Sequence, residues 1–326
     1  MLDYSTTKLS LDDIIAGEVK TVRILFMGTP EFAAEFLEFL VQENFNIVAV
    51  ISQKDKPKGR GLKLQPTPVK EVALKYGIPV FQPTNLIQEG LKIIEDSKPD
   101  IGIVVAFGRL LKKPFLDAIE FYNVHASLLP KYRGPAPIQR AIENGERITG
   151  ITIFKISEGM DDGDIALQRA FEVSECETFG DVYQKMLDIG KCLLKDFLLR
   201  YPVKLTPQDH SQASYAPKIE KEDLWIDFSK PAEHVRNKIR AYDPFPGAKA
   251  RFEGLEVKLF GACEITNVEL TANGIGEVLD VNRDGALITT GSGAVRVRLI
   301  QFPGKRPIHF YDAKNGGLVK LGSVFE

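Results

Sequence analysis

The sequence predicts an α/β protein in which a doubly wound, mostly parallel sheet is followed by a smaller β-barrel domain. Strand-like and helix-like patterns alternate with short connections through residues 21–199. Residues 100–107 (DIGIVVAF) form a near-continuous apolar run, which is typical of a strand covered on both faces. Beyond residue 221, short β segments alternate with turn signals, as in a small barrel. These signals are NG at 273–274, DG at 284–285 and GSG at 291–293.

The first predicted strand covers residues 21–27 and leads into the turn GTPEF. A helix follows, with Phe32, Phe36 and Leu40 on its apolar face and Pro30 at its start, where a missing N–H costs nothing. Residues 47–51 form the second strand, so this strand–helix–strand unit predicts parallel pairing. A dinucleotide site would need a glycine-rich turn here, and GTPEF is not one, which argues against a nicotinamide enzyme.

The same alternation continues along the chain. Helices are expected at residues 68–76 and 87–96, with a short strand at 78–81 between them, and an amphipathic helix at 178–199 closes the domain. Residues 201–221 are polar and lose periodicity, which is typical of a linker, and a helix follows at 232–241. We therefore divide the chain into an N-terminal extension (1–20), an α/β domain (21–203), a linker (204–221) and a C-terminal domain (222–326).

Composition narrows the function classes. The formal net charge of -2 provides no global field for a polyanion, so any nucleic-acid contact must rest on a local basic patch. Three cysteines are too few and too scattered for a disulfide framework or a metal site, which fits a reducing cytosol. The sequence contains no run of about 18 or more apolar residues, so no membrane span is predicted. Residues 1–20 resemble neither a secretory signal nor a transit peptide. We expect a cytoplasmic protein.

Two polar clusters follow predicted strands. Asn123 and His125 alternate along one strand and should point to the same side of the sheet, near the edge where open α/β sheets bind ligands. The turn GMDDGD (159–164) places Asp161 and Asp162 at another strand end. An amide, an imidazole and a carboxylate together can stabilise an oxyanion and move protons, as acyl transfer requires. Taken separately, the first pair could be structural and the second cluster a simple turn.

A basic segment interrupts the α/β pattern at residues 53–70 (QKDKPKGRGLKLQPTPVK). It contains six basic residues and a single acidic one, and its glycines and prolines are expected to forbid regular structure. A solvated, mobile loop is one interpretation. A contact with a phosphate backbone is the other. The cations are Lys54, Lys56, Lys58, Arg60, Lys63 and Lys70.

In combination, these clusters resemble one family. NVHASLLPKYRGPAPIQRAI (123–142), followed by ITIFKISEGMDDGDI (151–165), is similar to the formyltransferases that use 10-formyltetrahydrofolate. The stretch is most similar to the methionyl-tRNA formyltransferases. The resemblance implies that Asn123, His125 and Asp161 are catalytic, with Asp161 chosen over Asp162 because it stands two residues before the glycine. It also implies a folate pocket lined by Ser127, Leu128, Leu129 and Pro130.

The resemblance carries further expectations about partners. The family has an inserted basic loop that contacts the acceptor arm of initiator tRNA, and GRGLKLQPTPVK is similar to it. This implies tRNA contacts at Arg60 above all, and at Lys56, Lys58 and Lys63. The C-terminal domain would be the family's OB-like, tRNA-binding domain. We expect a monomer that binds initiator methionyl-tRNA and the folate co-substrate, with no membrane and no metal.

The implied reaction moves the formyl group of 10-formyltetrahydrofolate to the α-amino group of methionyl-initiator tRNA, giving N-formylmethionyl-tRNA for translation initiation. Three alternatives stay open on the sequence. These are formyl transfer to another amine such as a nucleotide sugar, hydrolysis of the formyl donor by water, and a tRNA-binding module whose α/β domain is inactive. The charge of His125 in the resting state is also open, because a coupled His–Asp pair titrates as a unit.

Overall fold

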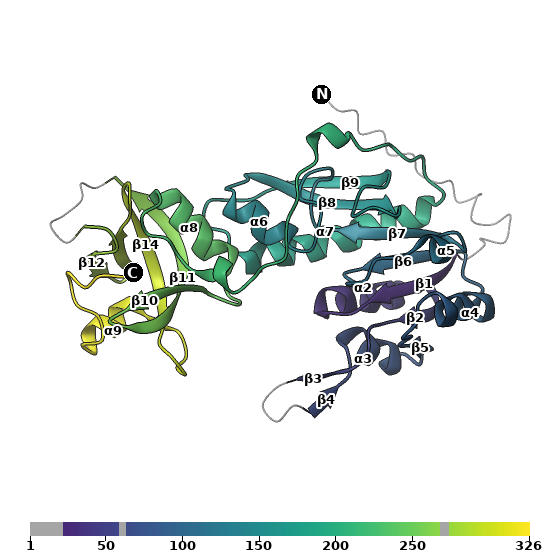
Figure 1. Ribbon diagram of the computed structural model, residues 1–326, viewed down its shortest axis with the longest axis horizontal. Helices are drawn as coiled ribbons and strands as arrows, with labels where there is room; N and C mark the ends of the chain where they lie inside the picture. The colour runs from purple at the N-terminus through teal and green to yellow at the C-terminus, as the bar shows by residue number, and fades with distance from the viewer. Residues whose placement is uncertain (1–21, 59–62, 268–273) are drawn as a thin grey trace.

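The chain folds into an α/β domain and a smaller β domain that lie end to end (Figure 1). The structure is a computed structural model that describes residues 22–58, 63–267 and 274–326. Among these residues, no helix combines the length and the apolar character needed to cross a membrane.

The α/β domain is organised around a seven-stranded sheet with the order β5-β2-β1-β6-β7-β8-β9. The first five strands in this order are parallel, whereas β8 and β9 pair antiparallel at one edge. The prediction of a mostly parallel sheet is confirmed. The strands are β1 (Arg23–Gly28), β2 (Asn46–Ile51), β5 (Val80–Phe81), β6 (Ile101–Val105), β7 (Glu120–His125), β8 (Ile148–Lys155) and β9 (Ile165–Glu172).

Helices cover both faces of this sheet. Side chains of β1 alternate between two cores: Ile24 and Phe26 pack with α2 and α7, while Leu25 and Met27 pack with α4 and α5. Thr178 begins the long helix α7 with a capping box, since its side chain and that of Asp181 each accept from the other's backbone N–H. The helices are α2 (Glu31–Gln42), α3 (Pro68–Lys75), α4 (Gln88–Ser97), α5 (Lys113–Leu116), α6 (Pro137–Glu143) and α7 (Phe179–Arg200).

The basic segment after β2 contains regular structure, contrary to expectation. It forms a two-stranded hairpin of β3 (Lys56–Lys58) and β4 (Lys63–Gln65), which projects from the α/β domain (Figure 1). Pro57 lies opposite Leu64 in this pair. A proline is tolerated there because each strand of an isolated pair has a free edge, where a missing N–H breaks no ladder bond. The expectation that glycine and proline forbid regular structure was therefore wrong.

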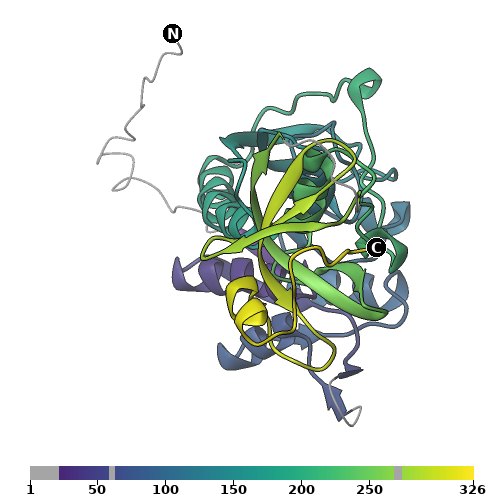
Figure 2. The ribbon, with the colours of Figure 1, turned by 90° about the vertical axis from the view of Figure 1, so that its left-hand side faces the viewer.

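The C-terminal domain is built mainly of short β-strands, as predicted, and these strands pair antiparallel. Figure 2 looks onto this domain, with the α/β domain behind it. The end of the chain joins both borders of the sheet, because Phe325 bridges Phe252 of β10 and Val324 bridges Glu277 just before β12. The elements are α8 (Ala232–Ala241), β10 (Ala248–Phe252), β11 (Leu255–Thr266), β12 (Val278–Asn282), β13 (Gly285–Thr289), β14 (Ala294–Gln301), β15 (Ile308–His309) and α9 (Phe310–Asn315).

The two domains share one apolar core. Val235 and Ile239 of α8, and Tyr242 directly after it, belong to the same buried cluster as Ile142 of α6 and Val182 of α7. Such a continuous core holds the domains together more firmly than a polar contact would.

A disulfide also joins the domains, which corrects the expectation drawn from the scattered cysteines. Cys176, in the loop before α7, is bonded to Cys263 of β11, although 87 positions separate them in the sequence. Cys192 is a free, exposed thiol. The chain thus has one covalent link between domains rather than a framework of several.

Candidate active site

A cavity of about 500 Å³ lies where the strand order of the sheet reverses. From β1 the chain proceeds to β2 and β5 on one side, and then returns to β6 and β7 on the other. Such switch points open a crevice beyond the carboxyl ends of the strands, and this is where α/β sheets bind ligands. The end of β6, the end of β7 and parts of the segments 134–139 and 156–161 line the cavity.

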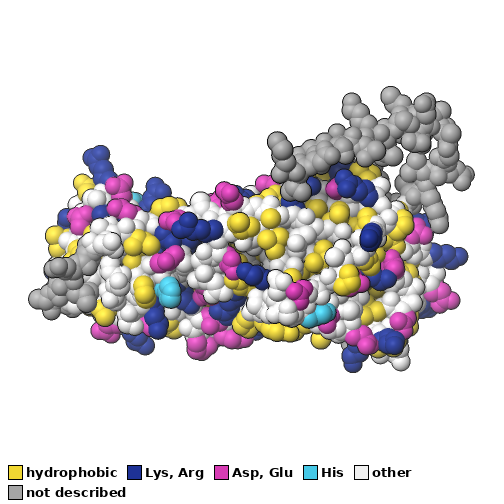
Figure 3. All heavy atoms as spheres, turned by 90° about the horizontal axis from the view of Figure 1, so that it is seen from above, with side chains coloured by type: hydrophobic (Ala, Val, Ile, Leu, Met, Phe, Trp, Pro, Cys, Tyr) yellow, Lys and Arg dark blue, Asp and Glu magenta, His cyan; other side chains and the backbone are white. Residues whose placement is uncertain are grey.

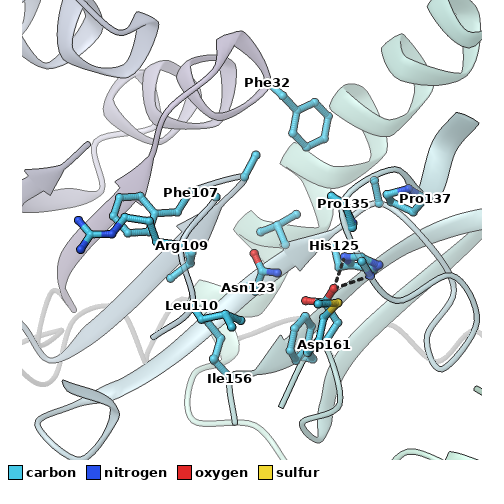
Figure 4. A pocket seen from close by; sticks show the side chains of 18 of the residues that line it. Phe32, Phe107, Arg109, Leu110, Asn123, His125, Pro135, Pro137, Ile156 and Asp161 are labelled. Atoms are coloured by element: carbon cyan, nitrogen blue, oxygen red, sulfur yellow. Dashed lines mark hydrogen bonds and ion pairs between the residues drawn. The ribbon is translucent and has the colours of Figure 1, made fainter. Parts of the chain in front are cut away.

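Asn123 and His125 both line this cavity, as their spacing on β7 predicted. Figure 4 shows the Asn123 carboxamide pointing into the space between the walls. Within the described residues, no hydrogen bond occupies that carboxamide, so both its donors and its acceptor are available to a ligand. A half-buried amide held on a rigid strand is a suitable donor to a developing oxyanion.

The ring of His125 is buried and is held from two sides. Its Nε2 lies 2.9 Å from the carbonyl oxygen of Tyr132, which can only accept, so Nε2 carries the proton and donates. Its Nδ1 lies 3.6 Å from Oδ2 of Asp161 (Figure 4). With acceptors facing both nitrogens, any positive charge that develops on the ring is stabilised by the Asp161 carboxylate.

Asp161 is fixed by the loop that follows β7. The backbone N–H of Gly134 donates to Asp161 Oδ2 at 2.8 Å. Asp161 itself has a positive φ of 50°, a left-handed conformation that a non-glycine residue adopts at some cost and that often marks a functional site. Asp162 does not line the cavity, and its carboxylate accepts a hydrogen bond from Ser157 instead. Of the two adjacent acids, only Asp161 faces the histidine.

Aromatic and aliphatic side chains form the two ends of the cavity. Phe32 of α2 lies near Phe179 and Tyr183 of α7 at one end, and Phe107 and Leu110 lie at the other (Figure 4). Burial, with Glu31 and Glu35 nearby, raises the pKa of Tyr183 to about 12, so its hydroxyl stays protonated at neutral pH.

The segment after β6, residues 106–111, is a part of the site that our sequence reasoning missed. The carbonyl of Phe107 accepts from Thr29 Oγ1 at 3.2 Å and from Gln53 Nε2 at 2.6 Å, which fixes this segment against the ends of β1 and β2. A signal was present: these residues directly follow the most apolar strand, at the sheet edge where ligands bind.

The four residues expected to line a folate pocket are not brought to the cavity lining. Ser127 and Leu129 are buried behind it, where Thr152 Oγ1 donates to Ser127 O and accepts from Leu129 N. Leu128 and Pro130 are half-buried in the same turn. This turn anchors the loop that carries Gly134. Direct contact of these four residues with folate stays a prediction.

The predicted tRNA contacts lie on the β3–β4 hairpin and are only partly described. Arg60 lies outside the described residues. Lys56 is exposed on β3, with its Nζ 3.5 Å from Gln53 Oε1, and Lys58 pairs with Lys63 through the backbone. Lys70 is instead held by Asp55 at 2.6 Å and by Gln82, at the base of the hairpin.

Comparison with known proteins agrees with this geometry. Residues 21–198 match the family described as formyl transferase, and residues 218–317 match the formyl transferase C-terminal domain. The chain belongs to the formyl transferase family. It is 67% identical over 306 residues to the methionyl-tRNA formyltransferase of Fervidobacterium nodosum, covering 93% of this chain and 99% of that protein.

A second relative, the methionyl-tRNA formyltransferase of Thermosipho melanesiensis, is 61% identical over 94% of this chain and 100% of its own length. This chain is therefore a member of the methionyl-tRNA formyltransferase branch of the formyl transferases. Among solved structures, HypX from Aquifex aeolicus in complex with tetrahydrofolic acid is similar in fold, with a TM-score of 0.61 and 24% identity over 91% of this chain. The chain spans about half of HypX, 47% of its length.

Proposed function

We propose that this protein transfers the formyl group of 10-formyltetrahydrofolate to the α-amino group of methionyl-initiator tRNA. The observation that carries the proposal is the convergence of Asn123, His125 and Asp161 on one cavity at the switch point of the sheet. The product, N-formylmethionyl-tRNA, serves translation initiation, so we place the reaction in the cytoplasm.

In the proposed reaction, the amine nitrogen attacks the formyl carbon and a tetrahedral intermediate forms with negative charge on oxygen. Asn123 donates to that oxygen. The bond from carbon to the folate nitrogen then breaks. The amine loses one proton and the departing folate nitrogen gains one. We assign one of two roles to His125: it stabilises the charge on oxygen, or it passes the proton to the departing folate nitrogen. Asp161 holds His125 and offsets its positive charge.

The apolar ends of the cavity suit the two substrates. We assign the end formed by Phe107, Leu110 and Ile156 to the flat pterin ring, and the aromatic end at Phe32 and Tyr183 to the thioether side chain of methionine. A cavity of about 500 Å³ is of the size that suits the reacting portions of both molecules.

We further propose that the basic hairpin contacts the tRNA through Arg60, Lys56, Lys58 and Lys63. The net charge of -2 gives no global attraction for a polyanion, and on the face seen in Figure 3 basic and acidic side chains are interspersed, so we expect attraction for phosphates to come from a local cluster of cations. Arg60→Ala should lower kcat/KM for charged tRNA, and the loss should shrink as salt rises, because screening already weakens the contact it removes. A wild-type value at low salt would remove Arg60 from the interface.

The division into a catalytic domain (21–203), a linker (204–221) and a tRNA-binding domain (222–326), acting as a monomer, is part of the same proposal. The decisive experiment incubates the protein with labelled formyl donor and with methionine-charged initiator or elongator tRNA. Label should appear on the initiator tRNA. Release of formate without tRNA would indicate a hydrolase, and label on neither tRNA would refute the proposed function.

A further inference from the structure

One buried side chain outside the cavity joins both of its polar loops. Gln208 lies in the segment between the two domains and is 5% exposed. Its Nε2 donates to the carbonyl oxygens of Asp161 at 3.0 Å and Gly163 at 2.7 Å. Its Oε1 accepts from the Arg133 guanidinium, at 3.2 Å from Nε and 2.7 Å from Nη2. The carboxamide therefore uses its donors on one loop and its acceptor on the other.

The backbone around this glutamine is fixed to the same two loops. On one side, Thr206 and Ile165 exchange two hydrogen bonds of 2.8 Å. On the other side, Arg133 N donates to Ser214 O at 2.8 Å, and Ala216 N donates to Arg133 O at 2.7 Å. The segment between the domains thus runs as a strap along the active-site loops instead of hanging free between domains. We call residues 206–216 the strap.

The strap also packs closely against the loop that holds the catalytic carboxylate. Gly134, which donates to Asp161, has a φ of 117°, and a Cβ at this position would lie 2.8 Å from the carbonyl oxygen of Ala216. Only glycine fits this approach and this backbone conformation.

Asp161 needs such external support. Its left-handed backbone conformation is less stable than an extended or helical one and persists only where surrounding contacts determine it. The bonds from Gln208 to the carbonyls of residues 161 and 163 are contacts of this kind. They hold the backbone of the turn, whereas the Gly134 N–H holds the Asp161 carboxylate itself.

We propose that Gln208 is a positioning residue for formyl transfer, which sets the Asp161 carboxylate against His125 by clamping the 159–164 turn to the loop after β7. It touches neither substrate, and it acts through Asp161. The kinetic test of this proposal rests on the proposed function, whereas a second test, by amide hydrogen exchange, rests on geometry alone. The proposal about Gln208 and the proposed function can therefore fail separately.

The test uses two substitutions of similar volume. Gln208→Met removes all four hydrogen bonds, whereas Gln208→Glu keeps an acceptor for Arg133 but has no donor for the turn. Both should lower kcat about ten- to a hundredfold, because a small misplacement of a catalytic group costs that much, while KM for charged tRNA changes little. Gln212→Met is the matched control, since Gln212 is exposed in the same strap and bonds only to Asp209 among the described residues.

Two measurements distinguish positioning from a general loss of structure. In an Asp161→Asn background, Gln208→Met should lower kcat by less than about threefold, because the effects of residues that act through one another are not additive. If Gln208→Met lowers kcat by the same factor in that background as in the wild-type protein, the proposal is overturned. Full activity of Gln208→Glu would also overturn it, since it would assign the effect to Arg133.

The second measurement needs no substrate. Amide hydrogen exchange in residues 158–165 should be faster in Gln208→Met and Gln208→Glu than in the wild-type protein, and unchanged in Gln212→Met. Unchanged exchange in both Gln208 variants would overturn the proposal, even if formyl transfer itself is shown. Absence of formyl transfer in the wild-type protein would instead refute the proposed function. The exchange measurement would then decide by itself whether Gln208 holds the 159–164 turn.

Discussion

Replacing Asp161 by asparagine removes one charge from the site and leaves the geometry almost intact. The amide oxygen of the new side chain can still accept from Gly134 N–H, the hydrogen bond that holds the carboxylate at 2.8 Å. What is lost is the attraction between Oδ2 and the Nδ1 of His125, 3.6 Å away, whenever the ring carries positive charge.

That distance sets the expected size of the effect. Two unit charges 3.6 Å apart attract by about 4 to 5 kcal/mol at an effective dielectric constant near 20. The Asp161 side chain is 18% exposed, so water screens part of this attraction. We expect roughly 3 kcal/mol of lost transition-state stabilisation in Asp161→Asn, which is on the order of a hundredfold in kcat.

The assay is single-turnover formylation of methionyl-initiator tRNA, with Tm measured alongside. Asp162→Asn is the matched control, because this neighbouring acid does not line the cavity and accepts a hydrogen bond from Ser157. We expect it to retain most of its activity. If Asp161→Asn and Asp162→Asn lose activity equally, or if Asp161→Asn stays within threefold of wild type at unchanged Tm, our account of the His125–Asp161 pair is refuted.

Three further predictions follow from other contacts. Asn123→Ala should lower kcat on the order of a hundredfold to a thousandfold, with little change in Tm, because the carboxamide has no partner in the described part of the chain; a large drop in Tm would contradict this. Burial raises the pKa of Asp243 in the folded protein. The ionised carboxylate therefore lowers the free energy of unfolding at pH 7, and this cost disappears at acid pH, below the raised pKa, where the carboxyl is protonated. Asp243→Asn, which can still accept from Gly261 N–H, should therefore raise the free energy of unfolding at pH 7, measured by urea denaturation, and have less effect near pH 3. Reduction of the Cys176–Cys263 disulfide should lower Tm, because opening a loop of this length removes up to about 4.6 kcal/mol from the free energy of unfolding; an identical Tm with and without reductant would exclude the bond.

Local patterns were enough to predict most of the α/β domain. The apolar run of β6 and the proline at the start of α2 each indicated their element to within a few residues. The strand β9 was not predicted, because it forms the edge of the sheet, seven of its eight residues are partly or fully exposed, and the polar pair Gln168 and Arg169 interrupts its apolar residues. An edge strand lacks the apolar signal that marks a buried one.

The three polar residues of the candidate site were predictable from local patterns together with the family resemblance, which picked Asp161 from a turn at another strand end. Asn123 and His125 share a side of β7 because strand side chains alternate, and no tertiary information is needed for that. The role of Gln208 depends on which loops meet in space, and this residue has no local pattern that reveals it. The pairing of Cys176 with Cys263 was hidden for the same reason, since 87 positions separate them.

The apolar core that runs through both domains limits how members of this family can be recombined. Val235 and Ile239 of α8, and Tyr242 directly after it, belong to the same buried cluster as side chains of α6 and α7. A fragment that stops at residue 200 would leave that surface bare in water and prone to aggregate. Chimeras made from two relatives should therefore keep α8 with its own α/β half and exchange only the strands beyond residue 247.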